Sequence, residues 1–200
     1  MENQNTNSNL NPAQNVDPKK DRINQAIHRK RIKQLSWIVG VIVVIGLLIG
    51  GIVWYSIRDA KNLPGVFYPE QGREHIAPDH QHTYNSNPPT SGWHYPTPAS
   101  WGVYHEELPD EEVVHNLEHG GVWISYKPGI PDDVIKRLEG FFDTYGTKVI
   151  VTPRSKNDTD IALVVWTRLD KFNVSEFSEA RVDNFIRRLR NRTGPEPLAP

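Results

Sequence analysis

The sequence predicts an α+β fold in which one N-terminal transmembrane helix precedes a small two-layer domain with a long ordered loop region rich in His, Pro and aromatic residues. Three observations predict it: an apolar run without charges, a Pro-rich middle segment that excludes long helices, and alternating helix and strand patterns after residue 109. The expected parts are a disordered and basic cytoplasmic tail (1–34), a transmembrane helix (35–57), a stalk (58–71) and an extracytoplasmic α+β domain (72–195).

The N-terminal tail has two kinds of composition. Residues 1–16 are rich in Asn and nearly free of large apolar side chains, so they cannot offset the entropy cost of ordering. Residues 17–33 are basic. Residues 1–57 carry seven Lys and Arg against three Asp and Glu, whereas residues 58–200 carry sixteen against twenty-one. Residues 58–200 are therefore acidic and have no basic patch, which argues against nucleic acid as a partner.

The run 35–57 has the length of a membrane span, because 23 residues of helix extend roughly 34 Å. Trp37, Trp54 and Tyr55 suit the two interfaces, and the basic residues before the run predict a cytoplasmic N-terminus. A cleaved signal peptide fits less well, since a long tail precedes the run and no Ala-x-Ala site follows it. The sequence thus predicts a cell-membrane protein whose C-terminal domain is extracellular or periplasmic.

Two glycines inside the span, Gly46 and Gly50, form a small-xxx-small pair. Such pairs allow two membrane helices to approach closely, so a homodimer through this face is one interpretation. Glycine is also common in membrane helices that do not pair.

The segment from Glu74 to Pro109 is expected to be an ordered loop region. Its prolines exclude long helices, and its aromatic residues argue against disorder because each buries a large apolar surface. These aromatic side chains also suit stacking on sugars or peptides, although a place in the core is the commoner role for such residues.

The sequence of the remainder of the domain predicts a short helix that begins at Pro109 and is ended by Gly120. After this helix it predicts the element order β-α-β-β-α. Helices packed on one face of a small sheet would make this an α+β arrangement. The last helix is expected to start with a capping box. The expected elements are strand 122–126, helix 131–145, strand 148–152, strand 161–167 and helix 175–190, with Asn173 and Glu176 as the capping box.

Seven of the eight histidines lie between His75 and His119. His115 and His119 are four residues apart on the predicted short helix, and Glu118 is three residues from His115, so these side chains share one helix face. That spacing is typical of a helical metal pair. His94, in a turn fixed by Pro and Gly, and His75, at the start of the domain, are the candidates for further ligands.

The string from His115 to His119 also matches the His-x-x-Glu-His pattern of inverted zinc proteases, in which two His hold zinc and the Glu activates water. Gly120 and Gly121 end the helix directly after it, whereas the protease pattern lies inside longer helices. A structural role for the histidines, in helix capping or in bonds to backbone carbonyls, is a third interpretation.

The chain has no Cys and only the initiator Met, so a metal site here would consist of nitrogen and oxygen ligands. This ligand set suits zinc, copper(II), nickel or iron(II) rather than copper(I). Disulfides and Cys nucleophiles are excluded.

Four segments resemble the bacterial domain-of-unknown-function 3105 family: Gln71–His75, Tyr84–Pro96, Trp101–Tyr104 and His115–Val122. The resemblance covers residues 65–195 and implies a single membrane anchor before an outer domain. It places five residues on motif positions and leaves His80, His82 and His105 outside them. The five are His75, His94, His115, Glu118 and His119.

The function expected from the sequence is that of a single-pass membrane protein whose outer domain binds a divalent metal, zinc or copper. His94, His115 and His119 are the expected ligands, with His75 as a fourth and Glu118 as a ligand or a neighbour of one. The alternative is a non-catalytic module that binds a cell-envelope component or a protein partner, with histidines that only build the fold. A metal-dependent hydrolase is the third option.

Overall fold

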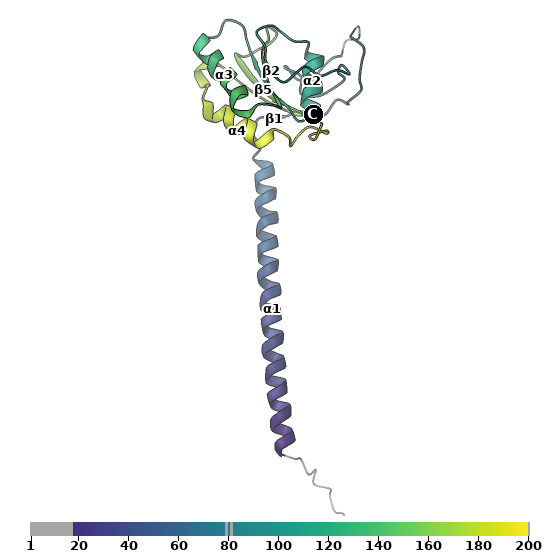
Figure 1. The fold of residues 1–200 in the computed structure, drawn as a ribbon, viewed down its shortest axis with the longest axis vertical. Helices are drawn as coiled ribbons and strands as arrows, with labels where there is room; N and C mark the ends of the chain where they lie inside the picture. The colour runs from purple at the N-terminus through teal and green to yellow at the C-terminus, as the bar shows by residue number, and fades with distance from the viewer. Residues whose placement is uncertain (1–17, 79, 81, 200) are drawn as a thin grey trace, which may run out of the picture. The chain divides into compact units, whose positions relative to one another are not determined.

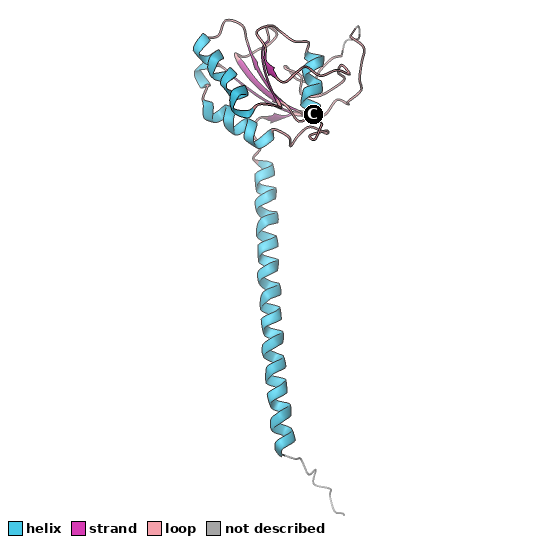
Figure 2. Ribbon diagram, in the orientation of Figure 1, coloured by secondary structure: helices cyan, strands magenta, loops and turns pink. Residues whose placement is uncertain are grey.

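The computed structural model describes residues 18–78, 80 and 82–199, so the Asn-rich stretch 1–16 lies outside the described residues. The chain divides into two compact units, one that ends at Lys61 and one that begins at Asn62. Figure 1 shows the path of the chain and Figure 2 its helices and strands.

The first unit is described as one helix, α1 (Pro18–Lys61). It is long and apolar enough to cross a membrane. The sequence predicts disorder for 1–34, but residues 18–34 are helical. Lys, Arg, Gln and Ala are good helix formers, and extending an existing helix avoids the cost of nucleation. Dimerisation through Gly46 and Gly50 stays a prediction.

The second unit is a mixed α/β domain, and its α+β class is confirmed. Its helices are α2 (Asp110–Glu118), α3 (Asp132–Tyr145), the 3₁₀ helix η1 (Val174–Glu176) and α4 (Glu179–Leu189). Its strands are β1 (Val66–Phe67), β2 (Gly102–Val103), β3 (Val122–Tyr126), β4 (Val149–Pro153), β5 (Ile161–Val165) and β6 (Arg168–Phe172).

The strands form one sheet in the order β1-β6-β5-β3-β4-β2. β3 and β4 are parallel and are joined by α3, as a parallel connection requires a crossover. β5 and β6 are antiparallel to their neighbours and form a hairpin. The central strands β3, β4 and β5 are buried along their whole length, which is typical of a sheet covered on both faces.

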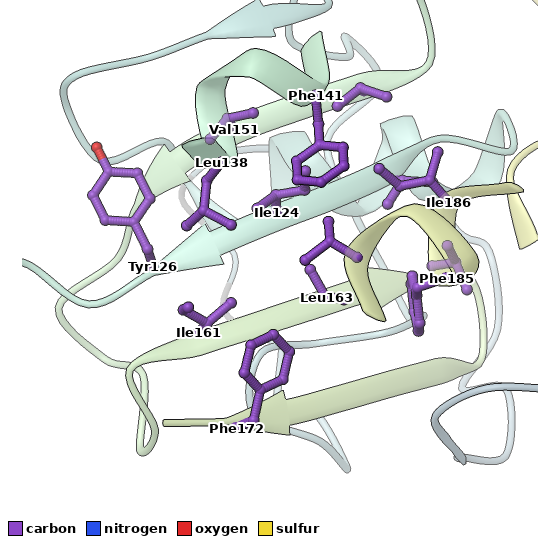
Figure 3. Packing of buried hydrophobic residues seen from close by; sticks show 14 of the residues in the cluster. Ile124, Tyr126, Leu138, Phe141, Val151, Ile161, Leu163, Phe172, Phe185 and Ile186 are labelled. Carbon is purple, nitrogen blue, oxygen red and sulfur yellow. The ribbon is translucent and has the colours of Figure 1, made fainter. Parts of the chain in front are cut away.

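Side chains alternate between the two faces of the sheet. Ile124 on β3 belongs to the core formed with α3 and α4, whereas the next residue back, Trp123, packs with α2. Figure 3 shows Ile124 and Leu163 of the sheet beside Phe185 and other side chains of α3 and α4. The expectation of helices on one face holds for α3 and α4. The other face is covered by α2 and the loop region.

The expected stalk is partly structured. From Asn62 the chain belongs to the folded domain, and β1 pairs with β6. Arg168 Nη1 donates hydrogen bonds to the carbonyls of Leu63, Pro64 and Gly65, which ties this segment to the sheet. A single arginine far along the sequence therefore orders a stretch that has no apolar pattern of its own.

Two details near the C-terminus differ from the prediction. β6 was not predicted, because its sequence Arg-Leu-Asp-Lys-Phe is largely polar, and the predicted strand 161–167 ends at Val165 in a turn. The capping box of Asn173 and Glu176 is present, but it starts η1. α4 begins later, at Glu179, where the Ser178 side chain accepts a bond from the Arg181 N–H.

The loop region before α2 is ordered, as predicted. Among its described residues, regular structure is confined to β2 and to a bridge between His75 and His94. Its centre is buried from Pro88 to Gly92. Tyr84, Trp101 and Tyr104 pack against the core on the α2 face, so these aromatic residues are mainly core.

Candidate metal centre

Two distant parts of the loop region meet at a parallel bridge between His75 and His94. The Ile76 N–H donates to the His94 carbonyl at 2.8 Å, and the His94 N–H donates to the Glu74 carbonyl at 3.1 Å. The two imidazole rings consequently lie 5.0 Å apart, edge to face. Backbone hydrogen bonds, rather than side-chain packing, bring these two histidines together.

The turn that carries His94 depends on Gly92. This glycine has φ +127°, a conformation that other residues rarely adopt, and an added Cβ would lie 2.9 Å from both His82 Nε2 and a Tyr84 ring carbon. The Ser86 hydroxyl accepts a bond from the Thr90 N–H at 3.0 Å and holds the preceding turn. His94 is fully buried as a result.

Helix α2 supplies the remaining candidates. Val113, Val114 and Leu117 bury one side of the helix in the core, which leaves His115 and Glu118 to face the loop region. Both residues are buried, with 5% of the surface of each exposed. A buried carboxylate and buried imidazoles require partners of suitable charge or hydrogen-bonding character.

Two glycines allow close packing at the point where the chain leaves α2. Gly120, at φ +79°, ends the helix after the cap residue His119. Gly121 has an ordinary φ, but an added Cβ would lie 2.5 Å from Trp101 Cζ3 and 2.7 Å from the Asn116 carbonyl oxygen. The second glycine is therefore required by a close approach of Trp101 rather than by its backbone conformation.

The two buried imidazoles have a defined orientation. His94 Nδ1 lies 2.8 Å from the Gly92 carbonyl oxygen, and His115 Nδ1 lies 2.6 Å from the Tyr95 carbonyl oxygen. A carbonyl oxygen only accepts, so each Nδ1 carries a hydrogen and donates it. In the neutral form of both residues, Nε2 then presents a lone pair to the interior of the cluster.

The Nε2 atoms face other polar atoms of the cluster. His94 Nε2 lies 3.1 Å from Glu118 Oε2, and His115 Nε2 lies 3.1 Å from His119 Nε2. Burial, together with the neighbouring His115 and His75, lowers the pKa of His94 to about 4, so this imidazole is neutral at pH 7. An ionised Glu118 would therefore set a carboxylate lone pair against an imidazole lone pair, which only a proton or a cation between them relieves.

The protonation of Glu118 responds to the same environment. Burial raises its pKa, and the charge of Glu196 raises it further, while His115, His75 and His119 oppose the shift. The metal-free pair is therefore consistent with a proton shared between Glu118 and His94. A divalent ion would take the place of that proton.

The ligand atoms fall into two overlapping groups. His75, His94, His115 and Glu118 each offer one atom, and these atoms all lie within 4.8 Å of one another. Glu118, His119 and Glu196 form the second group by the same measure. The structure thus brings together four of the five predicted site residues, and places the fifth, His119, beside an unpredicted glutamate.

A family model described as "Protein of unknown function (DUF3105)" matches residues 75–200. The chain belongs to the DUF3105 family. The resemblance stated from the sequence motifs is therefore confirmed. No curated protein and no solved structure shows a significant match to the chain. The matched DUF3105 region contains both groups of ligand atoms.

The other histidines of the DUF3105 domain lie outside these groups. His82 packs its ring on Trp93 and against the edge of Tyr84, with centroids 5.2 and 4.8 Å apart. His105 has a side chain that is 82% exposed and is 3.5 Å from Glu139. This placement agrees with the family motifs, which leave His80, His82 and His105 outside the motif positions.

Several residues of the centre could not be identified from the sequence. Glu196 lies in the C-terminal segment, where its Oε2 is 3.7 Å from His119 Nε2. Asn116 pairs with both backbone groups of Ala99 through bonds of 2.8 and 3.0 Å. The partners of the two imidazoles are backbone carbonyls, which carry no sequence signal. Among these residues only Glu196 had a sequence signal, since it is the single acidic residue of the segment 191–200.

Proposed function

We propose that the DUF3105 domain of this chain binds a divalent metal ion through His75, His94, His115 and Glu118. The observation that carries the proposal is the orientation of the two buried imidazoles. Their Nδ1 atoms donate to backbone carbonyls, and their Nε2 atoms point into the cluster, His94 Nε2 toward Glu118 Oε2 and His115 Nε2 toward His119 Nε2. Histidines that ligate metals almost always donate their other ring N–H in this way, which fixes the ring and the tautomer.

The dimensions of the cluster are compatible with a metal ion. Four ligands with bonds of about 2.0–2.1 Å around zinc lie about 3.4 Å apart. The His94–Glu118 distance is 3.1 Å, and the upper limit within the group is 4.8 Å. Small inward movements of His75, which is exposed and can rotate, would complete the set.

The ligand chemistry favours zinc or copper(II). Three imidazoles and one carboxylate form a nitrogen-rich site of intermediate softness, which suits these ions better than magnesium or calcium. Thiolates are absent from the whole sequence, so there is no competing Cys site within the chain.

A protease-like mechanism has less support. It needs His115 and His119 to hold one ion while Glu118 activates a water molecule. Here the Glu118 carboxylate lies 3.1 Å from His94 Nε2, among the ligand atoms, and His119 joins a different group. The metal-binding proposal therefore does not include hydrolysis.

The proposal also places the domain outside the cytoplasm, anchored by α1. Support comes from the length and apolar character of α1 and from the excess of Lys and Arg on its N-terminal side. The chain has no Cys, so Lys156→Cys, at an exposed position, provides a unique label site. Labelling by a membrane-impermeant maleimide on intact cells or spheroplasts is expected, and labelling only after lysis would reverse the orientation.

Metal content tests the central proposal. The full chain, purified in detergent without a histidine tag, is stripped with a chelator and titrated with Zn²⁺ and Cu²⁺ by calorimetry. We expect saturable binding and a higher melting temperature in the presence of metal, because a ligand that binds only the folded state stabilises it. Absence of both effects would reject metal binding.

A matched pair of exposed histidines separates a specific site from nonspecific binding. His75 and His105 are both exposed, but only His75 belongs to the cluster. His75→Asn is expected to weaken binding more than the ~10–100-fold that loss of an outer hydrogen-bond partner costs. His105→Asn is expected to leave the affinity unchanged. Equal effects of the two substitutions would contradict the site.

A further inference from the structure

Glu118 belongs to both groups of ligand atoms in the described part of the chain. In one group it accompanies the three histidines His75, His94 and His115, and in the other it accompanies His119 and Glu196. A carboxylate has two oxygens, and each can ligate a different ion. We infer that Glu118 bridges two metal positions, the second formed by Glu118, His119 and Glu196. This inference rests on the proposed function, because the first position is the one proposed above.

The two positions are adjacent. His115 and His119 lie one helical turn apart, with ring centroids separated by 4.6 Å and rings nearly perpendicular. Their Nε2 atoms are 3.1 Å apart, so the ligand atoms of the two groups are close neighbours. Ions held by the two histidines would be neighbours, in the manner of two-metal sites whose ions lie about 3.5–4 Å apart.

The second position is built by the C-terminal segment. The Glu196 N–H donates to the Glu118 carbonyl at 3.0 Å, and the Asn191 N–H donates to the Gly120 carbonyl at 2.8 Å. These bonds fix the backbone of the segment against the end of α2. A Cβ on Gly194 would collide with the Glu118 carbonyl oxygen, so glycine permits this approach.

A lysine supports the same arrangement. Lys148 Nζ donates to the His119 carbonyl at 2.8 Å and also to the Ala199 carbonyl. It therefore links the cap of α2 to the last residues of the chain. Two hydrogen bonds from the backbone of the C-terminal segment and two from Lys148 therefore hold this segment, and with it Glu196, near His119.

The two positions differ in chemistry. The first has three imidazoles and one carboxylate, and three of its four residues are buried. The second has two carboxylates and one imidazole, and it is more open, with side-chain exposures of 12% for His119 and 57% for Glu196. An ion there would keep water molecules among its ligands and would favour harder ions such as Mn²⁺. The second ion should bind more weakly than the first.

Stoichiometry tests the inference on the full chain in detergent. Zn²⁺ is titrated into the stripped protein by calorimetry, and bound metal is counted after desalting. Wild type is expected to bind two equivalents in two affinity classes. Glu196→Gln is expected to bind one equivalent with the tighter affinity retained. Since Glu196 is exposed, this variant should fold normally, and Glu179→Gln, another exposed glutamate, serves as the matched control that keeps both equivalents.

Spectroscopy provides a second measurement. Mn²⁺ added to protein that already holds one equivalent of Cu²⁺ should broaden the copper electron paramagnetic resonance signal, and Glu196→Gln should abolish the broadening. One equivalent in both wild type and Glu196→Gln would overturn the bridged pair but leave the proposed site intact. Two equivalents in Glu196→Gln would overturn the role of Glu196, and no binding at all would overturn both proposals.

Discussion

The two faces of the sheet are stabilised in different ways. Under α3 and α4 the contacts are almost entirely apolar, as between Leu163 and Phe185. On the face covered by α2 and the loop region, apolar contacts are joined by buried polar groups such as His94, Asn116 and Glu118. Apolar burial is non-directional, whereas each buried polar group needs a particular partner. The positions of side chains are therefore specified more closely on the α2 face, and the candidate metal centre lies on that face.

The apolar face should show the largest stability effect. Phe185 is completely buried, and Phe185→Ala is expected to reduce the free energy of unfolding by about 3–5 kcal/mol through lost burial and a new cavity. The metal affinity of the folded fraction should not change. Denaturant titration followed by tryptophan fluorescence, with and without metal, measures both quantities.

Phe177→Ala is the control for this substitution, because Phe177 is only partly buried at the edge of the same core. Its cost should be clearly smaller. If Phe185→Ala instead removed metal binding from a folded protein, the two faces would not be independent.

On the α2 face a substitution that disturbs close packing should reduce the free energy of unfolding by a smaller amount. Gly121→Ala is expected to reduce the free energy of unfolding by about 1–3 kcal/mol, because the added methyl meets Trp101 and the Asn116 carbonyl. It should also weaken metal binding, because a displacement of the Asn116 backbone would move the adjacent ligand His115 on α2. Thermal unfolding and zinc titration of the same preparation would reveal both changes.

Gly140→Ala is a matched control on the apolar side. Gly140 lies inside α3, and an added Cβ would meet nothing within 4 Å. Alanine is the better helix former, so a gain of roughly 0.5–1 kcal/mol is expected. A loss in Gly140→Ala comparable to that in Gly121→Ala would remove the distinction between the faces.

Acidic pH is expected to have a smaller effect than these substitutions, a gradual loss of metal affinity. The pKa of Glu118 is raised by burial and by Glu196, whereas that of His94 is lowered to about 4. Protons therefore compete with the metal at Glu118 at higher pH than at His94, and affinity should fall as pH falls. Calorimetric titrations from about pH 7.5 down to about pH 5.5 measure the slope of metal affinity against pH.

Glu118→Gln removes the titrating carboxylate from the centre. Its affinity should be weaker at every pH, but it should depend less on pH than that of wild type. The same slope in both proteins would show that protonation of Glu118 is not linked to metal binding.

Much of the apolar face could be predicted from the sequence. Val182, Phe185, Ile186 and Leu189 follow the helical period, and β3, β4 and β5 are short runs of mostly apolar residues, so the predicted positions were close to those observed. The errors fell on β6 and on the start of α4. There, polar residues in the strand and a 3₁₀ turn before the helix concealed the boundaries.

The candidate site was only partly predictable. Spacing on α2 placed His115, Glu118 and His119 near one another, and the Pro and Gly residues marked an ordered turn at His94. The sequence could not show that His119 lies beside Glu196, because the C-terminal segment reaches α2 through backbone bonds. The carbonyl partners of His94 and His115 were equally hidden, since every residue has a carbonyl.

The most direct test of the metal centre is the ligand environment of a bound ion. X-ray absorption spectra of the full chain loaded with one equivalent of Zn²⁺ should show three imidazole nitrogens and one oxygen at about 2.0–2.1 Å. His75→Asn should lose one imidazole, and His105→Asn should give the wild-type spectrum. A spectrum without imidazole scattering, or one unchanged by His75→Asn, would contradict metal binding by His75, His94, His115 and Glu118.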